Sequence, residues 1–307
     1  MQISIFDGSK PFKIDKPIRL IELFAGYGSQ SLALKYLGIQ YQHHKISEWA
    51  VRSIQAYKDL HFSEDNTDYS NGHDIEEIKN FLKGRISYDY STPASDERIN
   101  KMSEIEARKI FSNMVCTKNL GSIMTIKGEE LKIADTDKYC YIMTYSFPCQ
   151  DLSSAGKGAG MGRDSGTRSG LLWEVERLLK ETPNLPQVLL MENVPEVIGT
   201  NNIKHFAQWV EFLERLGYKC KWGVLNSKNF QIPQNRQRCF MVSVLGDYYY
   251  DMPESCGLKL KLKDVLEHNV DESFYLSDRI VNYFENHSKE CEEKGNGFRF
   301  TPTDGGV

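Results

Sequence analysis

The chain has 307 residues, of which 40% are hydrophobic and 26% charged, and this composition excludes a disordered, fibrous or collagen-like protein. No run of about 18 apolar residues is present, and residues 1–12 lack the basic and apolar regions of a secretory signal, so we expect neither a membrane span nor a secretion leader. The formal net charge of −4 is unusual for a small protein that wraps nucleic acid, although it leaves room for a locally positive cleft.

The first part of the chain alternates between strand patterns and helical patterns. The expected elements are a strand over 18–23, a helix that ends at Gly38, a strand over 41–48, a helix over 50–58 and a strand end within 72–78. A glycine turn, residues 24–28, connects the first strand to the first helix. Strand, glycine turn and helix in this order are typical of the opening of a βαβ unit.

Residues 79–138 are polar and rich in charge, and we interpret them as an insertion on the edge of the core, with a helix near 96–114. The elements expected after it are a strand over 139–146, a mobile glycine-rich loop over 151–169, a helix over 171–180, a strand over 187–191, a helix over 205–216 and a strand pair over 218–225 and 239–245. This alternation predicts an α/β fold with a mostly parallel sheet. The candidate motifs all lie at carboxyl ends of expected strands, which is where ligands bind in such sheets.

Gly26 and Gly28 follow the first expected strand and would let the backbone approach a ligand closely. Such a turn alone is a weak signal, because many are only tight connections and position 31 is Ser rather than the third glycine of a dinucleotide site. Glu48 strengthens the signal, since a carboxylate twenty residues after Gly28 can accept both ribose hydroxyls of an adenosine. Trp49 offers a flat face for an adenine ring. The alternative is a solvated Glu48 beside a core Trp49.

Two further strand ends carry candidate residues. Asp74 could accept from an adenine amino group or, equally, cap a helix that begins at residue 75. Cys149, in Pro148-Cys149-Gln150, is the one cysteine of seven that stands at a strand end before a glycine-rich loop. It is either a nucleophile, if the site supplies a base or lowers its pKa, or a buried inert thiol. The cysteines show no C-x-x-C and no zinc-ligand spacing, so we expect reduced thiols and no metal site.

The last two candidates lie near the end of the alternating pattern. Glu192, before Asn193, is either an acid or hydrogen-bond donor in a cleft, or an acid favoured by a helix dipole. Arg236 and Arg238 alternate before an apolar strand, so both guanidinium groups point to the same side of an extended chain. Such a pair suits a carboxylate, carbonyl or phosphate, unless the two are only solvated edge charges.

Taken together, these motifs resemble those of the cytosine-5 methyltransferase family, in the form found in bacterial and phage restriction–modification systems. The resemblance covers roughly residues 18–245. The segments that look like the family's first, second, third, fourth, sixth and eighth motifs are ELFAGYGS (22–29), SEWA (47–50), HDI (73–75), SFPCQDLSSAGKGAG (146–160), MENVPE (191–196) and IPQNRQR (232–238). The combination of Pro-Cys-Gln, Glu-Asn-Val and Gln-x-Arg-x-Arg is highly specific.

The resemblance implies a Rossmann-like methyltransferase fold, with helices on both faces of the sheet, that uses S-adenosylmethionine and acts on double-stranded DNA. A cytosine is flipped out of the duplex into the pocket. Cys149 attacks carbon 6 of the base, and carbon 5 then takes the methyl group. Glu192 holds ring nitrogen 3, Arg238 donates to the base carbonyl oxygen, and Arg236 positions Glu192.

The same resemblance implies which residues surround the two ligands. Those implied to line the S-adenosylmethionine site are Phe24, Ala25, Gly26, Tyr27, Gly28, Glu48, Trp49, Asp74, Ile75, Pro148 and Leu172. Those implied to face the base or to belong to the loop beside it are Gln150, Ser153, Asn193 and Gln234. The loop over 151–169 would close over the flipped base.

The chain departs from the family pattern after residue 245, where nothing resembles the ninth motif or the closing Gly-Asn-Ser segment. We therefore expect a catalytic domain over 1–245 and, over 246–307, the incomplete start of a target-recognition region or an interface segment. The chain would then be a truncated form, or one subunit of an enzyme whose second polypeptide brings the missing parts. Either leaves an apolar surface uncovered beside the helix over 30–37, and such patches favour association.

Three rival interpretations were weighed: a tRNA cytosine-5 methyltransferase, a catalytically silent cofactor-binding subunit and a nicotinamide dehydrogenase. The chain has no Cys-Phe-Thr tripeptide of the tRNA-directed kind, which disfavours the first. The intact Cys149, Glu192, Arg236 and Arg238 disfavour the second, and the missing third glycine disfavours the third. We expect a cytoplasmic enzyme of a bacterium or a phage-infected cell.

Overall fold

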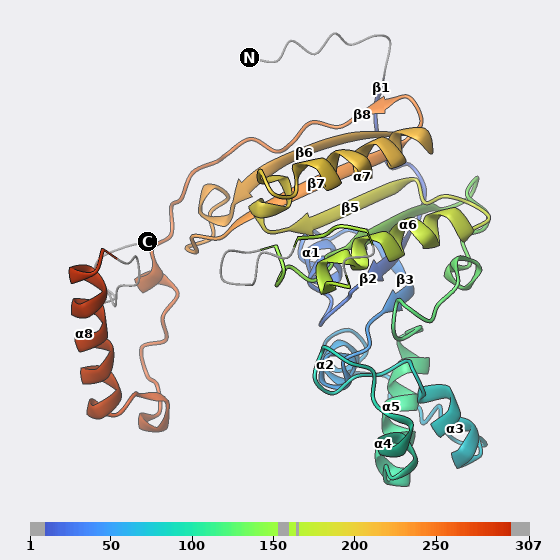
Figure 1. Ribbon diagram of the computed structural model, residues 1–307, viewed down its shortest axis with the longest axis horizontal. Coiled ribbons are helices and arrows are strands. Elements are labelled where there is room, and N and C mark those ends of the chain that lie inside the picture. The colour runs from blue at the N-terminus through green and yellow to red at the C-terminus, as the bar shows by residue number, and fades with distance from the viewer. Residues whose placement is uncertain (1–9, 153–159, 164–165, 296–307) are drawn as a thin grey trace. The chain divides into compact units, whose positions relative to one another are not determined.

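The computed structural model describes residues 10–152, 160–163 and 166–295. The strands are β1 (Lys10–Pro11), β2 (Ile18–Leu23), β3 (Tyr41–Ser47), β4 (Cys140–Tyr145), β5 (Val188–Asn193), β6 (Tyr218–Asn226), β7 (Gln237–Leu245) and β8 (Tyr248–Tyr249). The α-helices are α1 (Ser29–Tyr36), α2 (Val51–His61), α3 (Ile75–Leu82), α4 (Asp96–Asn100), α5 (Glu104–Cys116), α6 (Leu172–Glu181), α7 (Ile203–Arg215) and α8 (Asp278–Glu293). Figure 1 shows them in chain order by colour.

The central feature is one sheet, which in the described residues has six strands in the order β3-β2-β4-β5-β7-β6. β2 pairs in parallel with β3 and with β4, and β4 pairs in parallel with β5. β7 runs antiparallel to β5. Parallel neighbours need crossover connections, which place helices on the faces of the sheet. The expected α/β fold with a mostly parallel sheet is therefore confirmed.

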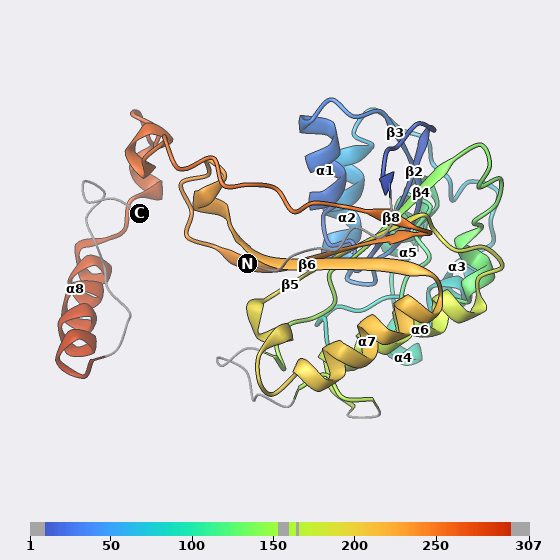
Figure 2. The same ribbon diagram turned by 90° about the horizontal axis from the view of Figure 1, so that it is seen from above.

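Helices cover both faces of this sheet, as Figure 2 shows for α1 on one side and α6 and α7 on the other. Alternate residues of β2 face opposite ways, so Leu20 packs with Leu34 of α1, while Ile21 belongs to the larger core. That larger core includes Leu178 of α6 and Trp209 of α7, both fully buried. Burial of this apolar core stabilises the packing of α6 and α7 on the sheet, and this packing fixes the positions of the strand ends.

The predicted insertion, residues 79–138, holds the end of α3 and all of α4 and α5, and α2, α3, α4 and α5 share a second apolar cluster. The helix expected near 96–114 is present but divided into α4 and α5. Ser95 and Ser103 each cap one of the two helices, because their hydroxyls accept from the amides of Arg98 and Glu106. The strand end expected within 72–78 was wrong, because α3 begins at Ile75.

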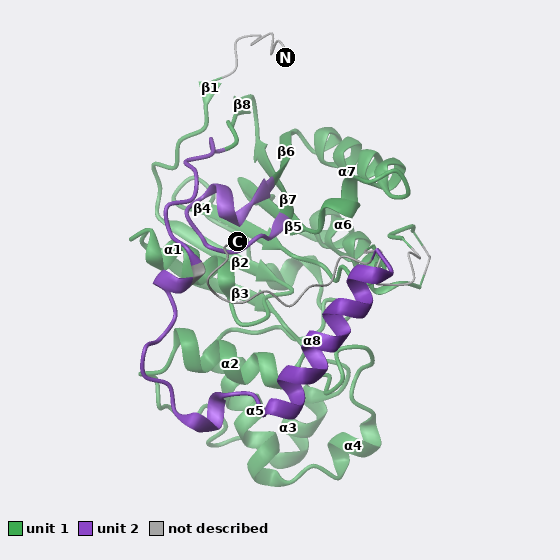
Figure 3. Ribbon diagram, turned by 90° about the vertical axis from the view of Figure 1, so that its left-hand side faces the viewer, with its two compact units in different colours: residues 1–224, 238–252 green, residues 225–237, 253–307 purple. Residues whose placement is uncertain are grey.

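The chain separates into two compact units, coloured in Figure 3. Unit 1 comprises residues 1–224 and 238–252, and it contains nearly all of the sheet. Unit 2 comprises residues 225–237 and 253–307. Within unit 2 the carbonyl of Asn229 accepts from the amides of Cys256 and Gly257, which ties its two segments together. In the part of the chain that the structure describes, none of the helices has the length and apolar character to cross a membrane.

Candidate active site

The register of the sheet aligns the carboxyl ends of four neighbouring strands. Leu23 pairs with both Ser47 and Tyr145, and Tyr145 pairs with Met191. The residues that follow these four are Phe24, Glu48, Ser146 and Glu192. One edge of the sheet therefore brings together the glycine turn, the acid after β3, the segment before Cys149 and the acid after Met191.

The glycine turn between β2 and α1 is built for a close backbone approach. Gly28 has φ of +80°, a conformation that residues with a Cβ rarely adopt. A Cβ at Gly28 would lie 2.3 Å from Nε2 of His61 and 2.7 Å from Cε2 of Tyr57. His61 also contacts the turn through Nε2, which lies 2.9 Å from the carbonyl oxygen of Tyr27. α2 therefore packs directly beneath the turn, and no larger residue fits at position 28.

Glu48 supports this turn with its carboxylate. Oε2 accepts from the amide of Gly26 at 2.8 Å, and Oε1 accepts from the amide of Ala50 at 2.7 Å. Burial raises the pKa of Glu48, and these backbone hydrogen bonds act in the opposite direction. Trp49, which follows, is half-buried, and its carbonyl accepts from the amide of Ser87 in the insertion. Glu48 is therefore buried against the glycine turn and is not the solvated strand end of the alternative interpretation.

Asp74 lies elsewhere, at the start of α3 and just before the predicted insertion. Its exposed carboxylate accepts from the amide of Glu76 and caps α3, which is the second of the two interpretations that the sequence allowed. Ile75 is the first residue of α3 and packs against the insertion core. The expectation that these two residues follow a third strand is thus wrong, because Ile75, Ile78 and Leu82 repeat at helical spacing.

The segment beside the end of β3 was missed by the sequence reasoning. Asn119 forms a parallel bridge with Ile46, and the amide of Leu120 donates to the carbonyl of Ile46. Asn119 also hydrogen-bonds the main chain of Glu48. The available signal was a short Asn-Leu-Gly-Ser-Ile segment, 119–123, after the helical pattern, but its length is below what strand periodicity can detect.

The segment before Cys149 is fixed from two sides. Asn193 Nδ2 donates to the carbonyl of Phe147 at 3.0 Å, and Ser169 Oγ donates to the carbonyl of Pro148 at 2.7 Å. Cys149 itself is half-buried and packs against the main core. Gln150, the next residue, is exposed. Asn193 thus acts as a bridge between the ends of β5 and β4.

Other cysteines differ from Cys149 in their surroundings. Burial raises the pKa of four other thiols to about 11; these are Cys116, Cys140, Cys220 and Cys239. These four remain protonated at neutral pH and are poor nucleophiles. Cys149 is half-buried and lies just after the end of β4, at the strand edge described above.

Glu192 and Arg238 form an ion pair, with Arg238 Nε 3.0 Å from Glu192 Oε1. Both side chains are about four-fifths buried. We expected Arg236 to position Glu192, but in the structure Arg238 forms the ion pair with Glu192. Arg236 is exposed in unit 2, where its amide donates to Oδ1 of Asn226 and to the carbonyl of the exposed Gln234. Alternation had placed both arginines on one face but could not say which of them reaches the acid.

The two arms of the loop after Cys149 are tied together by Asp151. Its Oδ2 accepts from the amides of Arg168 at 2.8 Å and Ser169 at 3.2 Å, and its carbonyl accepts from the amide of Gly160 at 3.0 Å. Arg168 begins the short 3-10 helix Arg168–Leu171, which leads into α6 at the fully buried Leu172. Ser153, an expected site residue, lies outside the described residues.

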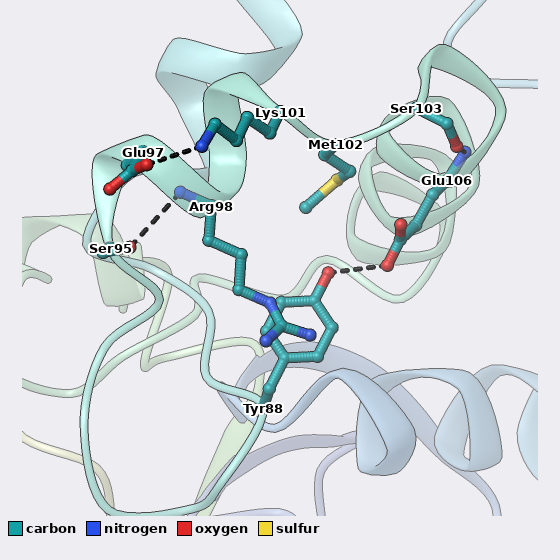
Figure 4. Close-up of a pocket in the computed structure, with 8 residues that line it drawn as sticks. All are labelled: Tyr88, Ser95, Glu97, Arg98, Lys101, Met102, Ser103 and Glu106. Carbon is teal, nitrogen blue, oxygen red and sulfur yellow. Dashed lines mark hydrogen bonds and ion pairs between the residues drawn. The ribbon is translucent and has the colours of Figure 1, made fainter.

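A pocket in the insertion is separate from these strand ends. Figure 4 shows Arg98 over the ring of Tyr88, with its guanidinium carbon 3.7 Å from the ring centroid. The Tyr88 hydroxyl donates to Glu106 Oε1 at 2.6 Å. None of the residues that line this pocket belongs to the expected site. Its polar groups pair with one another, so we interpret it as part of the insertion's own packing.

Comparisons with known proteins identify the family. The family model for C-5 cytosine-specific DNA methylases matches residues 94–304. The chain is 37% identical to the Type II methyltransferase M2.ScrFI of Lactococcus lactis subsp. cremoris, over 86% of this chain and 71% of that protein. It is 35% identical to the orphan methyltransferase M.SssI of Spiroplasma monobiae, over 86% of this chain and 69% of that protein.

Solved structures support the fold. The Dnmt2 methyltransferase of S. pombe superposes with a TM-score of 0.54 at 17% identity, covering 89% of this chain and 67% of that one. The methyltransferase EhMeth of Entamoeba histolytica gives 0.51 at 16% identity, covering 87% and 65%. The chain belongs to the C-5 cytosine-specific DNA methylase family, whose members transfer a methyl group from S-adenosylmethionine to carbon 5 of cytosine in DNA.

Proposed function

We propose that Cys149, Glu192 and Arg238 carry out the chemistry on a cytosine that is flipped out of the duplex. The observation that supports this most is the shared strand edge, where Glu192 pairs with Arg238 and Asn193 holds the carbonyl of Phe147 two residues before Cys149. A soft nucleophile, an acid and a cation are the groups that the reaction needs.

In the proposed sequence the Cys149 thiolate forms a bond from Sγ to carbon 6 of the base, and the electron pair moves to make carbon 5 nucleophilic. Glu192 hydrogen-bonds ring nitrogen 3 and stabilises the charge that develops on the ring, while Arg238 donates to the base carbonyl oxygen. S-adenosylmethionine would supply an electrophilic methyl group to carbon 5, with S-adenosylhomocysteine as the leaving group. Solvent water then accepts the proton from carbon 5, the electron pair of that C–H bond restores the carbon 5–carbon 6 double bond, and the Sγ–carbon 6 bond breaks to regenerate the thiolate.

We propose that the glycine turn and Glu48 hold S-adenosylmethionine. Two observations support the fit. Side chains of α2 leave no room for a Cβ at Gly28, so the backbone there is open to close approach by a ligand. The buried carboxylate of Glu48 already accepts a hydrogen bond from the turn. The residues proposed to line this site are Phe24, Ala25, Gly26, Tyr27, Gly28, Glu48, Trp49, Pro148 and Leu172. Ala25 and Leu172 are buried and fit only as its walls. Glu48 would accept from the ribose hydroxyls, as acids at this position do in related folds.

For DNA, we propose that residues 246–307 contribute to target recognition. Gln150, Gln234 and Arg236 are exposed side chains suited to contact the base or the backbone beside it. Because matched relatives include Type II methyltransferases, we propose that the chain serves in a restriction–modification system.

We further propose that a second polypeptide covers an apolar face at the end of α1. Tyr36 is 83% exposed and Leu37 74% exposed, and Ile39 beside them is also exposed. Adjacent apolar side chains with this exposure favour association with another protein surface. Robust sequence-specific methylation of mixed-sequence DNA by the purified chain alone would contradict a requirement for this partner.

The experiment that tests the function is transfer of tritium from labelled S-adenosylmethionine to duplex DNA, with tRNA as the competing substrate. Incorporation into DNA at carbon 5 of cytosine supports the proposal, and incorporation into tRNA alone would overturn it. For the cofactor site, Glu48→Ala should weaken S-adenosylmethionine binding by about tenfold or more, the scale of a lost charged hydrogen bond. An unchanged dissociation constant in calorimetry would remove Glu48 from the site.

A further inference from the structure

Asn119 is a buried amide side chain, 4% exposed, that pairs with the main chain of Glu48. Its Nδ2 donates to the Glu48 carbonyl at 2.9 Å, and its Oδ1 accepts from the Glu48 amide at 3.1 Å. The same Oδ1 accepts from the amide of Gly121 at 2.9 Å. One side chain therefore satisfies both main-chain polar groups of Glu48 at the point where β3 has ended.

The Asn119 side chain thus makes the two hydrogen bonds to the Glu48 main chain that a neighbouring strand would otherwise make. Up to Ile46 the segment pairs with β3 through its backbone, and beyond it Ser47 Oγ donates to the carbonyl of Gly121 at 2.8 Å. Without Asn119 the amide and carbonyl of Glu48 would be buried without partners, which proteins rarely tolerate. Glu48 would then relax, and its carboxylate would no longer be aimed at the amide of Gly26.

The segment that carries Asn119 is itself held by an earlier part of the insertion, at Arg85. The amide of Ser122 donates to the carbonyl of Arg85 at 3.0 Å, and Arg85 Nη1 donates to the carbonyl of Leu120 at 3.1 Å. Gly121 has φ of +81°, and a Cβ there would lie 2.7 Å from both Cβ and the carbonyl oxygen of Arg85. Such a close approach needs glycine, so residues 119–122 pack directly against Arg85.

We propose that Asn119 is a positioning residue for S-adenosylmethionine, acting through Glu48, and that the insertion stabilises the cofactor site by holding Asn119. The inference rests on the proposed cofactor role of Glu48. Asn119 fixes the main chain from which the carboxylate extends and makes no contact with the ligand itself. It gives the insertion a role that the catalytic motifs alone do not suggest.

The test compares cofactor affinity and turnover in the full chain, with S-adenosylmethionine as the probe in calorimetry. Asn119→Ala should raise the dissociation constant about tenfold or more, since two hydrogen bonds to a buried main chain are lost. Turnover at saturating cofactor should remain within about threefold, because the catalytic edge is untouched. Asn119→Asp keeps the acceptor oxygen for the amides of Glu48 and Gly121 but sets a second acceptor oxygen against the Glu48 carbonyl, so it should bind S-adenosylmethionine no better than Asn119→Ala.

Asn113 provides the matched control. It is also a buried asparagine of the insertion, 8% exposed, and its Nδ2 donates to Gln55 rather than to Glu48. Asn113→Ala should lower the melting temperature to a similar degree and change cofactor affinity less than about twofold. Equal loss of affinity in both variants would show a general effect of destabilising the insertion and would overturn the proposal.

The double variant Glu48→Ala/Asn119→Ala separates action through Glu48 from an independent effect. If Asn119 acts through Glu48, the double variant binds S-adenosylmethionine no more weakly than Glu48→Ala alone. Multiplied losses, or a wild-type dissociation constant in Asn119→Ala, would overturn the positioning role. Should Asn119→Ala fail to fold, the same comparison with Asn119→Asp decides. An unchanged affinity in Glu48→Ala would instead refute the cofactor role of Glu48. That outcome is distinguishable from failure of the positioning role of Asn119.

Discussion

Arg238 and Glu192 form an ion pair across two antiparallel strands, with Nε and Oε1 3.0 Å apart. Glu192 on β5 faces Phe240 on β7, so Arg238 reaches the acid from two residues before Phe240 on that strand. Both groups lie at the edge that holds Cys149, and each keeps the other oriented where a base would enter. An acid and a cation side by side match the ring nitrogen and carbonyl oxygen of a cytosine, which are also neighbours.

Replacing Glu192 by Gln should slow methyl transfer by about a hundredfold or more, the usual effect of losing a group that acts in the transition state. The amide keeps the size of the side chain but cannot supply a proton or carry the charge that holds Arg238. Affinity for S-adenosylmethionine should stay within about twofold. Single-turnover tritium transfer and calorimetry on the same preparation measure the two quantities.

Glu196→Gln is the matched control for this change. Glu196 belongs to the neighbouring 3-10 helix Pro195–Ile198, so the substitution removes a similar charge close by. Its turnover should remain close to that of the wild type. A Glu192→Gln enzyme with wild-type turnover, or equal losses in the two variants, would refute the assignment of Glu192.

Cys149→Ser should reduce methyl transfer by several orders of magnitude, because a serine hydroxyl is not an effective nucleophile at neutral pH without a base. S-adenosylmethionine should bind as before, since the thiol attacks the base. The exposed Cys256 offers the control, because Cys256→Ser makes the same change far along the chain, in unit 2. Retention of more than about a tenth of wild-type turnover in Cys149→Ser would exclude Cys149 as the nucleophile.

Asp151→Ala should lower turnover by about ten- to a hundredfold, because displacing a reactive group by a small distance is costly. The Asp151 carboxylate caps the amides of Arg168 and Ser169, and it lies two residues from Cys149. Without it the two arms of the loop separate. Asp151→Asn retains an acceptor oxygen and should be less affected, whereas the exposed Asp137→Ala should behave as wild type.

Steady-state turnover and cofactor affinity, measured together, test the role of Asp151. The prediction requires turnover to fall while the dissociation constant of S-adenosylmethionine stays within about threefold. Equal turnover in Asp151→Ala and wild type would show that the backbone closes the loop without this carboxylate.

The sequence predicted the strands and the order of the motifs because both depend on local patterns. β2 occupies the expected residues 18–23, since an apolar run before a glycine turn has few alternative structures. Parallel pairing then brings successive strand ends to one edge, which is why Glu48 and Glu192 were expected at the same site as Cys149.

What could not be predicted depends on pairings between distant side chains. Alternation placed Arg236 and Arg238 on one face, but only the register of β5 and β7 shows that Arg238 meets Glu192. Asp74 looked equally suited to accept from an adenine amino group or to cap a helix, and in the structure its side chain caps α3. Asn119 carries no motif, because its role is to satisfy backbone groups more than seventy residues away in the chain.

A buried chain of hydrogen bonds beneath the glycine turn predicts how stability depends on pH. Tyr57 donates its hydroxyl proton to Glu22 Oε2 at 2.5 Å, and His43 Nδ1 lies 2.9 Å from the Tyr57 oxygen. Burial raises the pKa of Glu22 to about 7, while its hydrogen bonds to Tyr57 and Ser31 act in the opposite direction. Burial, together with the charges of His61 and Lys118, lowers the pKa of His43 to about 4.

These two groups act on stability with opposite signs. The folded protein holds the Glu22 proton between the ordinary pKa of 4.5 and about 7, so this group makes stability fall as pH rises through that range. The unfolded chain holds the His43 proton between about 4 and the ordinary 6.5, so His43 makes stability rise as pH increases there. In the wild type the two contributions largely cancel below neutral pH.

Glu22→Gln removes the first contribution and leaves the second, because glutamine does not titrate. The free energy of unfolding of the variant minus that of the wild type should therefore increase by about 3 kcal/mol between pH 4.5 and 8, at 1.36 kcal/mol for each pKa unit. Urea unfolding at several pH values across this range measures the difference. The exposed Glu64 serves as the control, and Glu64→Gln should give a difference that does not vary with pH. A Glu22→Gln difference that is equally flat would mean that Glu22 is ionised in the folded protein at its ordinary pKa, and that the hydrogen bonds from Tyr57 and Ser31 fully offset its burial.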